Sequence, residues 1–258
     1  MPSDRPIVDQ PVLAHRGASA FAPENTLRAV ELAAEMGAKW IETDVQITAD
    51  GGLVIIHDLE LDRTTSGNGF VGLTPTDHIR SLDAGSWFDP SFCNCRVPTL
   101  EEFLACILDN DLSLQLELKD LPGREYELAD AVCALLREYW PFGENGLFIS
   151  GFSPRCLMRA KQNLPDVPGA IALVCVPDDP DGYARDVGAS IIHVQDCFVD
   201  DAALERIRRS SVEFAVATVN DPDRANYLID SGVQSVLTDD PMVLQRGNMD
   251  TTTQAVAR

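Results

Sequence analysis

Residues 12–58 read VLAHRGASAFAPENTLRAVELAAEMGAKWIETDVQITADGGLVIIHD, and this stretch decides the fold. The short apolar run at 12–17 predicts a buried strand that ends in a glycine turn. Asn25 is the predicted N-cap of the amphipathic helix that follows. Residues 40–47 and 53–58 predict two strands joined by a tight turn, and therefore a β-hairpin. A strand, a helix and a second strand in this order form the repeating unit of α/β proteins.

The remainder of the chain repeats this alternation. Strand patterns lie at 112–119, 147–152, 170–176, 190–195, 213–220 and 235–240. Helical patterns lie at 99–108, 125–138, 154–163, 179–187, 201–209 and 222–230. With the strands at 12–17 and 40–47, eight strands can pair in parallel, which predicts a single α/β domain over residues 1–258 with the fold of a TIM (β/α)8 barrel. An open doubly wound sheet is the alternative, but no G-x-G-x-x-G motif follows the first strand.

Residues 59–98 interrupt the alternation. The segment is rich in Gly, Pro, Ser and aromatic residues, and it is too long for an ordinary loop between a strand and a helix. We therefore expect a small insertion after the second barrel strand, at about 59–98. Because the segment directly follows His57 and Asp58, we also expect it to form part of the substrate site.

The composition excludes several classes of protein. A formal net charge of −21 repels nucleic acid and anionic lipid, so neither is an expected partner. No segment approaches the roughly 18 consecutive apolar residues of a membrane span, and the N-terminus lacks the basic and apolar regions of a secretory signal. The seven cysteines are scattered, and Cys93 and Cys95 have no second pair with which to form a zinc site. We expect a cytoplasmic protein, while either a monomer or an oligomer fits this composition.

Three carboxylates lie where strands of the predicted barrel end. Glu42 and Asp44 share one face of their strand, about 7 Å apart along the backbone. On the strand at 112–119, Glu117 and Lys119 face the barrel mouth, while the alternating leucines face the helices. Carboxylates on one face repel one another unless a cation lies between them, and oxygen ligands suit a hard divalent ion. Glu42, Asp44 and Glu117 therefore predict a site for one divalent cation, Mg²⁺ or Ca²⁺.

Two of the four histidines, His15 and His57, end short strands that feed the same barrel mouth. Hydrolysis of a phosphodiester needs one group that takes a proton from the nucleophile and another that gives a proton to the leaving alcohol. Histidine has an ordinary pKa near about 6.5, so either residue can take either role at neutral pH. His78 lies in the insertion and His193 in a later strand, and both are interpreted as structural.

The same region offers positive charge for a phosphate group. The guanidinium of Arg16 fits phosphate oxygens, and Lys119 supplies a point charge. Gly17 is expected to let the backbone approach the ligand closely. Arg63 is either a further phosphate contact or a surface charge, and the surface interpretation is favoured.

Several short motifs occur in a fixed order along the chain. They are H-R-G…P-E-N-T at 15–26, E-x-D at 42–44, H-D at 57–58, R-T-T-x-G-x-G at 63–69, E-L-K at 117–119, T-V-N-D at 218–221 and T-D-D-P at 238–241. Together they resemble the glycerophosphodiester phosphodiesterase family, and AGSWFDPSF at 84–92 looks most like its bacterial cytosolic members. The resemblance runs from about residue 11 to 245.

This resemblance implies a TIM barrel with a small inserted subdomain, and hydrolysis of glycerophosphodiesters to sn-glycerol 3-phosphate and an alcohol. The implied catalytic pair is His15 and His57. The implied metal ligands are Glu42, Asp44 and Glu117, and the implied phosphate contacts are Arg16 and Lys119. The family often has an aromatic residue before T-V-N, where this chain has Ala217. That departure leaves the preferred alcohol open.

Two other functions fit the same barrel. A phospholipase D-like or lysophospholipase D activity needs an apolar groove for acyl chains, and the insertion offers Phe70, Trp87, Phe88 and Phe92. Its polar residues and the net charge of −21 argue against a membrane surface. A catalytically silent glycerophosphodiester-binding protein would lack a histidine or a metal carboxylate, and this chain has all of them. In the hydrolytic reaction, the nucleophile is either water or a hydroxyl group of the substrate's own glycerol.

Overall fold

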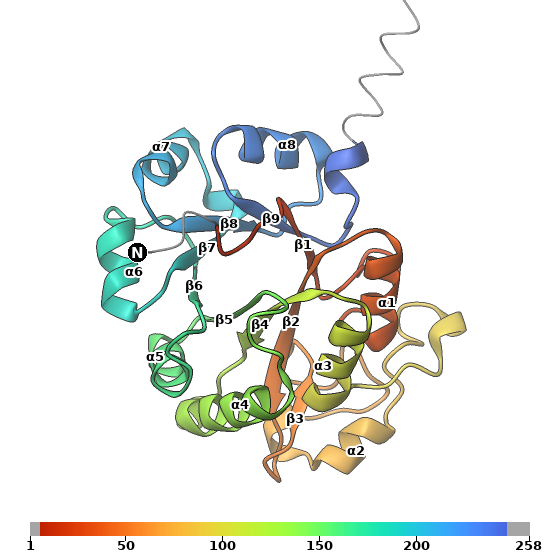
Figure 1. Ribbon diagram of the computed structural model, residues 1–258. Helices are drawn as coiled ribbons and strands as arrows, with labels where there is room; N and C mark the ends of the chain where they lie inside the picture. The colour runs from red at the N-terminus through yellow and green to blue at the C-terminus, as the bar shows by residue number, and fades with distance from the viewer. Residues whose placement is uncertain (1–5, 247–258) are drawn as a thin grey trace, which may run out of the picture.

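A computed structural model describes residues 6–246, and its strands form a sheet that closes into a barrel (Figure 1). The barrel strands are β1 (Val12–His15), β2 (Trp40–Ile47), β4 (Ser113–Leu118), β5 (Leu147–Gly151), β6 (Gly169–Leu173), β7 (Ile191–Gln195), β8 (Glu213–Ala217) and β9 (Ser235–Thr238). Each pairs in parallel with its neighbours, and β1 closes the ring by pairing with both β2 and β9. The predicted TIM barrel is confirmed.

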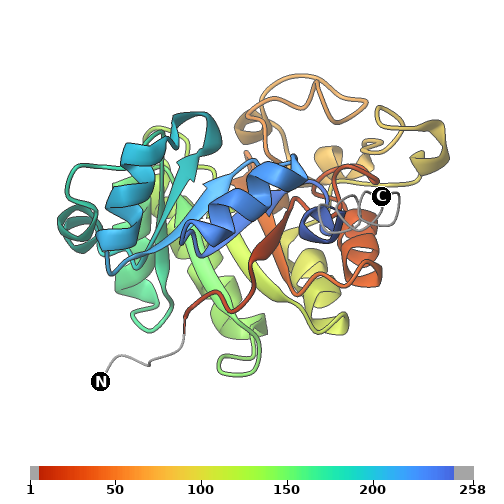
Figure 2. The same cartoon turned by 90° about the horizontal axis from the view of Figure 1, so that it is seen from above.

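Helices surround the barrel and cover the outer face of its strands (Figures 1 and 2). They are α1 (Leu27–Glu35), α3 (Leu100–Asp109), α4 (Glu125–Tyr139), α5 (Pro154–Asn163), α6 (Pro180–Val187), α7 (Asp201–Arg209) and α8 (Pro222–Asp230). Most begin with a side-chain cap, and at α3 Thr99 and Glu102 form a reciprocal capping box. Within residues 6–246, none of these helices is long and apolar enough to cross a membrane.

The barrel interior changes from apolar to polar along the strands. One apolar cluster fills part of this interior: Val8, Leu13, Trp40, Phe148, Ala170, Ile191, Ala215 and Leu237. Trp40 and Phe148 pack with ring centroids 5.5 Å apart. Glu42 and Asp44 follow Trp40 on the same face of β2, because side chains two residues apart in a strand point the same way. The apolar plug therefore places the charged residues at the carboxyl ends of the strands.

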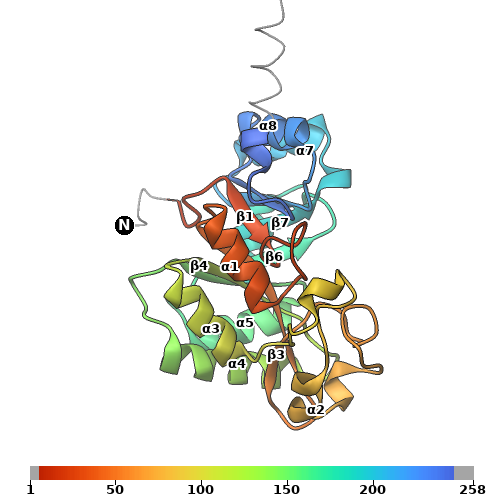
Figure 3. The same cartoon turned by 90° about the vertical axis from the view of Figure 1, so that its right-hand side faces the viewer.

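The insertion follows β3 (Leu53–Ile55), which pairs antiparallel with β2 and confirms the predicted hairpin. It contains α2 (Thr76–Ser81) and short 3-10 turns, and it lies at one side of the barrel beside α1 and β3 (Figure 3). It has a core of its own, formed by Val54, Ile56, Leu61, Val71, Ile79, Leu82, Ala84 and Val97. Because this core is separate from the barrel core, the segment is a small packed subdomain rather than a loose loop.

The predicted N-cap of α1 was wrong by one residue. Thr26 caps the helix, and its Oγ1 accepts a hydrogen bond from the backbone N–H of Ala29 at 3.2 Å. Asn25 is buried with φ +58°, a conformation that asparagine tolerates better than most residues. Its side chain donates to Asp44 Oδ2 at 2.8 Å and accepts from Thr43 Oγ1 at 2.7 Å. The side chain of Asn25, which the local pattern assigned to the helix cap, is therefore hydrogen-bonded to β2 instead.

Packing against helix α1 explains why position 17 is a glycine. It has φ +83°, and a Cβ atom there would lie 2.7 Å from the backbone carbonyl of Ala29. The close approach that glycine permits is thus to helix α1, and Gly17 is buried against that helix. The expected approach of the backbone to a ligand stays a prediction.

The interior packing gives a stability prediction. Phe148 is fully buried in the barrel interior, so Phe148→Ala should lower the free energy of unfolding by about 3–5 kcal/mol through the cavity that it leaves. Phe142 is 49% exposed, so Phe142→Ala is a matched control that should change stability by less than about 0.5 kcal/mol. Urea denaturation followed by circular dichroism measures both values. Equal losses in the two variants would contradict a barrel interior closed by this phenylalanine.

Candidate active site

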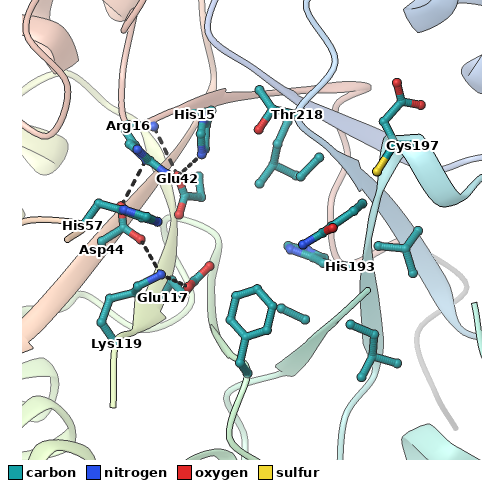
Figure 4. A pocket seen from close by; sticks show the side chains of 18 residues that line it. His15, Arg16, Glu42, Asp44, His57, Glu117, Lys119, His193, Cys197 and Thr218 are labelled. Atoms are coloured by element: carbon teal, nitrogen blue, oxygen red, sulfur yellow. Dashed lines mark hydrogen bonds and ion pairs between the residues drawn. The ribbon is translucent and has the colours of Figure 1, made fainter. Parts of the chain in front are cut away.

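A cavity of about 460 Å³ opens at the carboxyl ends of the barrel strands, and it brings together every site residue that the sequence suggested (Figure 4). Those residues come from four segments: the ends of β1 and β4, the middle of β2, and the turn after β3. They are His15, Arg16, Glu42, Asp44, His57, Glu117 and Lys119. Closure of the barrel is what makes these separate segments neighbours.

Three carboxylates meet on one side of this cavity. Glu42 and Asp44 lie on β2, Glu117 lies on β4, and Asp44 and Glu117 are paired in the strand register. One oxygen of each lies within 4.8 Å of an oxygen of the other two. Glu42 and Asp44 are each only 1% exposed, and Glu117 is 9% exposed. Three negative charges so close together and so poorly solvated repel one another strongly unless positive charge offsets them.

Two cations of the chain offset part of this charge. Arg16 Nε lies 3.3 Å from Asp44 Oδ2, and Lys119 Nζ lies 2.9 Å from Glu117 Oε1. Burial raises the pKa of Asp44, but Arg16 and Lys119 outweigh it and leave that pKa below its usual value. At Glu42 the balance is opposite, because burial together with Asp44 and Glu117 holds its pKa well above its usual value. The donor set therefore retains uncompensated negative charge and consists of hard oxygen ligands, which fits one divalent cation.

The two candidate catalytic histidines flank the carboxylates. His15 Nε2 lies 3.9 Å from Glu42 Oε2. The Nδ1 atom of His57 lies 2.6 Å from Asp58 Oδ1, which leaves Nε2 as the free ring nitrogen. Burial lowers the pKa of His57, although the charge of Asp44 acts to raise it. Both rings therefore line the cavity with a nitrogen available for proton transfer.

Arg63 connects the insertion to the site without lining the cavity. Its guanidinium donates to Asp58 Oδ2 at 2.6 Å and to Glu24 Oε2 at 2.7 Å. Glu24 in turn accepts from Arg16 at 2.8 Å. The side chain of Arg63 is 44% exposed, which agrees with a surface charge. That charge nevertheless connects Asp58, the partner of His57, to Glu24, the partner of Arg16.

The insertion itself contributes little to the cavity wall. Within the described chain, no residue of 59–98 lines the 460 Å³ cavity. An adjoining hollow of about 410 Å³ includes Leu59 together with Phe152 and Leu118. Contact between the insertion and a bound glycerol group stays a prediction.

Apart from Ala217 and the T-V-N-D motif that begins at Thr218, the sequence did not point to the opposite wall of the cavity. That wall comes from β5 to β9 and the loops that follow them: Phe152, Ala172, Leu173, His193, Val194, Gln195, Asp196, Cys197, Ala217, Thr218 and Leu237. Figure 4 shows His193, Cys197 and Thr218 across the cavity from the carboxylates. For the other residues of this wall the signal available was their position at strand ends, because their residue types are mostly neutral.

His193 has the buried position that its structural interpretation implies. It is 4% exposed, its Nδ1 lies 3.2 Å from Gln115 Nε2, and its ring meets Phe148 edge to face. Burial lowers its pKa to about 4, so the ring is neutral at pH 7. His193 therefore contributes a neutral, packed surface to the cavity floor. His78 is exposed in α2 and is not among the residues that line the cavity.

The chain is similar to enzymes of known activity. A glycerophosphodiester phosphodiesterase of Caldanaerobacter subterraneus is 35% identical over 237 residues, which cover 90% of this chain and 95% of the relative. A glycerophosphodiester phosphodiesterase of Bacillus subtilis is 31% identical and covers 89% of this chain and 83% of the relative.

Solved structures give the same result. A phosphodiesterase of Oleispira antarctica, in complex with the product sn-glycerol-3-phosphate, superimposes with a TM-score of 0.88 at 33% identity, covering 92% of this chain and 96% of that one. A glycerophosphodiester phosphodiesterase of Agrobacterium tumefaciens has a TM-score of 0.76 at 32% identity, covering 90% and 97%. The sequence profile of the glycerophosphoryl diester phosphodiesterase family matches residues 15–243. The chain therefore belongs to the glycerophosphoryl diester phosphodiesterase family, a family of phosphoric diester hydrolases.

Proposed function

We propose that this protein is a metal-dependent enzyme that hydrolyses glycerophosphodiesters to sn-glycerol 3-phosphate and an alcohol. The observation that carries the proposal is the set of three buried carboxylates that faces two histidines and two cations around one cavity. A relative that is 33% identical binds sn-glycerol-3-phosphate as product, which supports the same product here.

Glu42, Asp44 and Glu117 would hold one divalent cation, Mg²⁺ or Ca²⁺, because oxygen ligands suit both ions. Such a cation would neutralise negative charge on the phosphate oxygens. Arg16 and Lys119 are proposed to bind the phosphate, since both lie beside the carboxylates and line the cavity. Their fixed charges stabilise the negative charge that shifts between phosphate oxygens in the transition state.

His15 and His57 are proposed to move the protons. One takes a proton from the nucleophile, and the other gives a proton to the oxygen of the leaving alcohol. His15 ends β1 and His57 follows β3, and both line the same cavity as the carboxylates.

A second candidate function is lysophospholipase D activity. The observation in its favour is the 410 Å³ hollow beside the cavity, because Leu59, Leu118 and Phe152 give it apolar surface. An acyl chain attached to the glycerol could occupy such a hollow. Lysophosphatidylcholine compared with glycerophosphocholine in one assay separates the two activities.

We also propose a cytoplasmic location. All seven cysteines lie in the described part of the chain, and each is a free thiol. Free thiols, several of them exposed, suit a reducing compartment.

The central experiment is turnover of glycerophosphocholine by the purified protein with EDTA, with Mg²⁺ and with Ca²⁺. Turnover should require one of the two metal ions, and Asp44→Ala should remove it because a ligand is lost. Glu138 is exposed on α4, so Glu138→Ala is the control and should retain activity. Full turnover in EDTA would contradict the metal dependence. If neither glycerophosphocholine nor lysophosphatidylcholine is turned over with Mg²⁺ or with Ca²⁺, the result would favour a catalytically silent binding protein.

The two-histidine mechanism gives a second prediction. His15→Ala and His57→Ala should each lower kcat by about 100-fold or more, the range of general acid–base catalysis. The pH profile of kcat/KM should be bell-shaped in the wild type, because one histidine must be neutral and the other protonated. His78→Ala is the matched control, since His78 is exposed in the insertion. If the profile is the same in both single variants as in the wild type, the proposed roles are wrong.

The repulsion among the carboxylates predicts that Glu42→Gln raises the unfolding temperature of the metal-free protein at pH 7. Burial, Asp44 and Glu117 raise the pKa of Glu42 in the folded state. An acid whose folded-state pKa lies above its unfolded value destabilises the fold fully above the folded-state pKa; that effect shrinks as pH falls below the folded-state pKa and is gone below the unfolded-state pKa. The gain from Glu42→Gln should therefore shrink as pH is lowered. Calorimetry in EDTA measures both trends.

Glu138→Gln is the control for this comparison, because Glu138 is exposed on α4 and the substitution removes one negative charge outside the carboxylate group. Added Mg²⁺ or Ca²⁺ should raise the unfolding temperature of the wild type more than that of Glu42→Gln, since the folded state alone holds the ligands together. A lower unfolding temperature for Glu42→Gln in EDTA would contradict the charge argument.

A further inference from the structure

Two of the sequence motifs have no part in the mechanism so far, T-V-N-D at 218–221 and T-D-D-P at 238–241. They form the chain segments that follow β8 and β9. Asp239 of the second motif contacts His15, at the other end of the sequence, and Asn220 of the first motif contacts Asp239. His15 Nδ1 lies 2.7 Å from Asp239 Oδ1, across a separation of 224 residues.

Asp239 is itself held in place by neighbours from the segments that follow β1 and β8. Asn220 donates from Nδ2 to Asp239 Oδ2 at 2.6 Å, and Ser19 donates from Oγ to Oδ1 at 2.9 Å. Asn220 Oδ1 also accepts from the backbone N–H of Asp239 at 2.9 Å. Both carboxylate oxygens therefore have partners, and the direction in which Asp239 faces His15 is determined by the segments after β1, β8 and β9.

The charge of Asp239 determines which nitrogen of His15 carries its proton. Burial raises the pKa of Asp239, but hydrogen bonds from His15, Asn220 and Ser19 outweigh it and lower that pKa to about 2. The side chain is thus an ionised carboxylate at neutral pH, and an ionised carboxylate only accepts hydrogen bonds. Nδ1 of His15 therefore donates the proton to this bond. In neutral His15, Nε2 then has a free lone pair on the side of the ring that is 3.9 Å from Glu42.

We propose that Asp239, supported by Asn220, is a positioning residue that holds the ring of His15 in the orientation and tautomer needed for proton transfer at Nε2. This inference rests on the proposed phosphodiesterase function and extends it to two residues outside the cavity wall. Asp239 does not line the cavity, so it acts through His15 rather than on the substrate. A carboxylate behind a histidine fixes ring direction and tautomer in other enzyme sites as well.

The two histidines differ in how their carboxylates are neutralised. Asp58, behind His57, receives two hydrogen bonds from the guanidinium of Arg63. Asp239 has no ion pair with Arg or Lys in the part of the chain that the structure describes, and His15 is the one basic side chain that contacts it there. The orientation of His15 therefore depends on Asp239 more directly than that of His57 depends on Asp58.

The kinetic test is a double-mutant cycle measured with glycerophosphocholine and the metal ion that supports turnover. Asp239→Asn should lower kcat by about 10- to 100-fold, the usual cost of losing the partner that orients a functional histidine, with little change in KM. In a His15→Ala background the same substitution should cost nothing further. Asn220→Ala should lower kcat in the same direction by a smaller factor. Asp240→Asn is the matched control, because the neighbouring Asp240 pairs with Arg246 and contacts no histidine.

A second measurement does not depend on activity. The chain has four histidines, so ¹⁵N–¹H correlation spectra of the imidazole rings can be assigned by comparison with His15→Ala. The wild type should have His15 protonated at Nδ1, and Asp239→Asn should change that tautomer or make the Nδ1 proton exchange faster. The same spectra of Asp240→Asn should match the wild type.

Three results would overturn the inference. They are an unprotonated Nδ1 in neutral His15, full kcat in Asp239→Asn, and an equal loss of kcat from Asp239→Asn with and without His15. Wild-type protein that fails to hydrolyse glycerophosphocholine would instead contradict the proposed function, while the spectra would still decide whether Asp239 orients His15.

Discussion

Mutual repulsion among three buried carboxylates is the constraint on which the remainder of the site depends. Glu42, Asp44 and Glu117 place ligand oxygens within 4.8 Å of one another in a poorly solvated position. Such a group is stable in a folded chain only if cations and hydrogen-bond donors surround it. Arg16, Lys119 and Asn25 supply part of that environment. Arg16 does so with φ +58°, a strained conformation of the kind that surrounding contacts maintain at functional sites.

Strand β2 connects the carboxylates to the rest of the fold. All eight of its residues are buried, and it pairs with β1, β3 and β4. One strand therefore carries two of the carboxylates, lies beside the strand of His15, pairs with the strand of Glu117, and leads through the hairpin to His57. The insertion begins at the same hairpin, and Arg63 extends from it to the partners of His57 and Arg16. The subdomain is thus connected to the chemistry by one ion-pair network rather than by the cavity wall.

Most of the fold and one side of the site could be predicted from local patterns. Alternating leucines on the strand at 112–119 indicated which side of β4 faces the helices, and so which side carries Glu117 and Lys119. The histidines at strand ends were found by the same reasoning, because a parallel barrel gathers its strand ends at one mouth. The error came where a local rule competed with a tertiary contact. Asn25 fits a helix cap in sequence, but Asp44 and Thr43 engage its side chain.

By itself, the sequence determined the order of strands and helices, the α/β class, and the residue types that could bind a cation and move protons. Periodicity and charge are local properties, so they can be read without knowing what lies across the barrel. Only the tertiary structure decided the neutral wall that faces the carboxylates, and the contact between His15 and Asp239 across 224 residues. Such contacts depend on closure of the ring between β1 and β9. Nothing in the short-range pattern around either residue specifies its partner, because the partner is brought near only by the packing of the whole barrel.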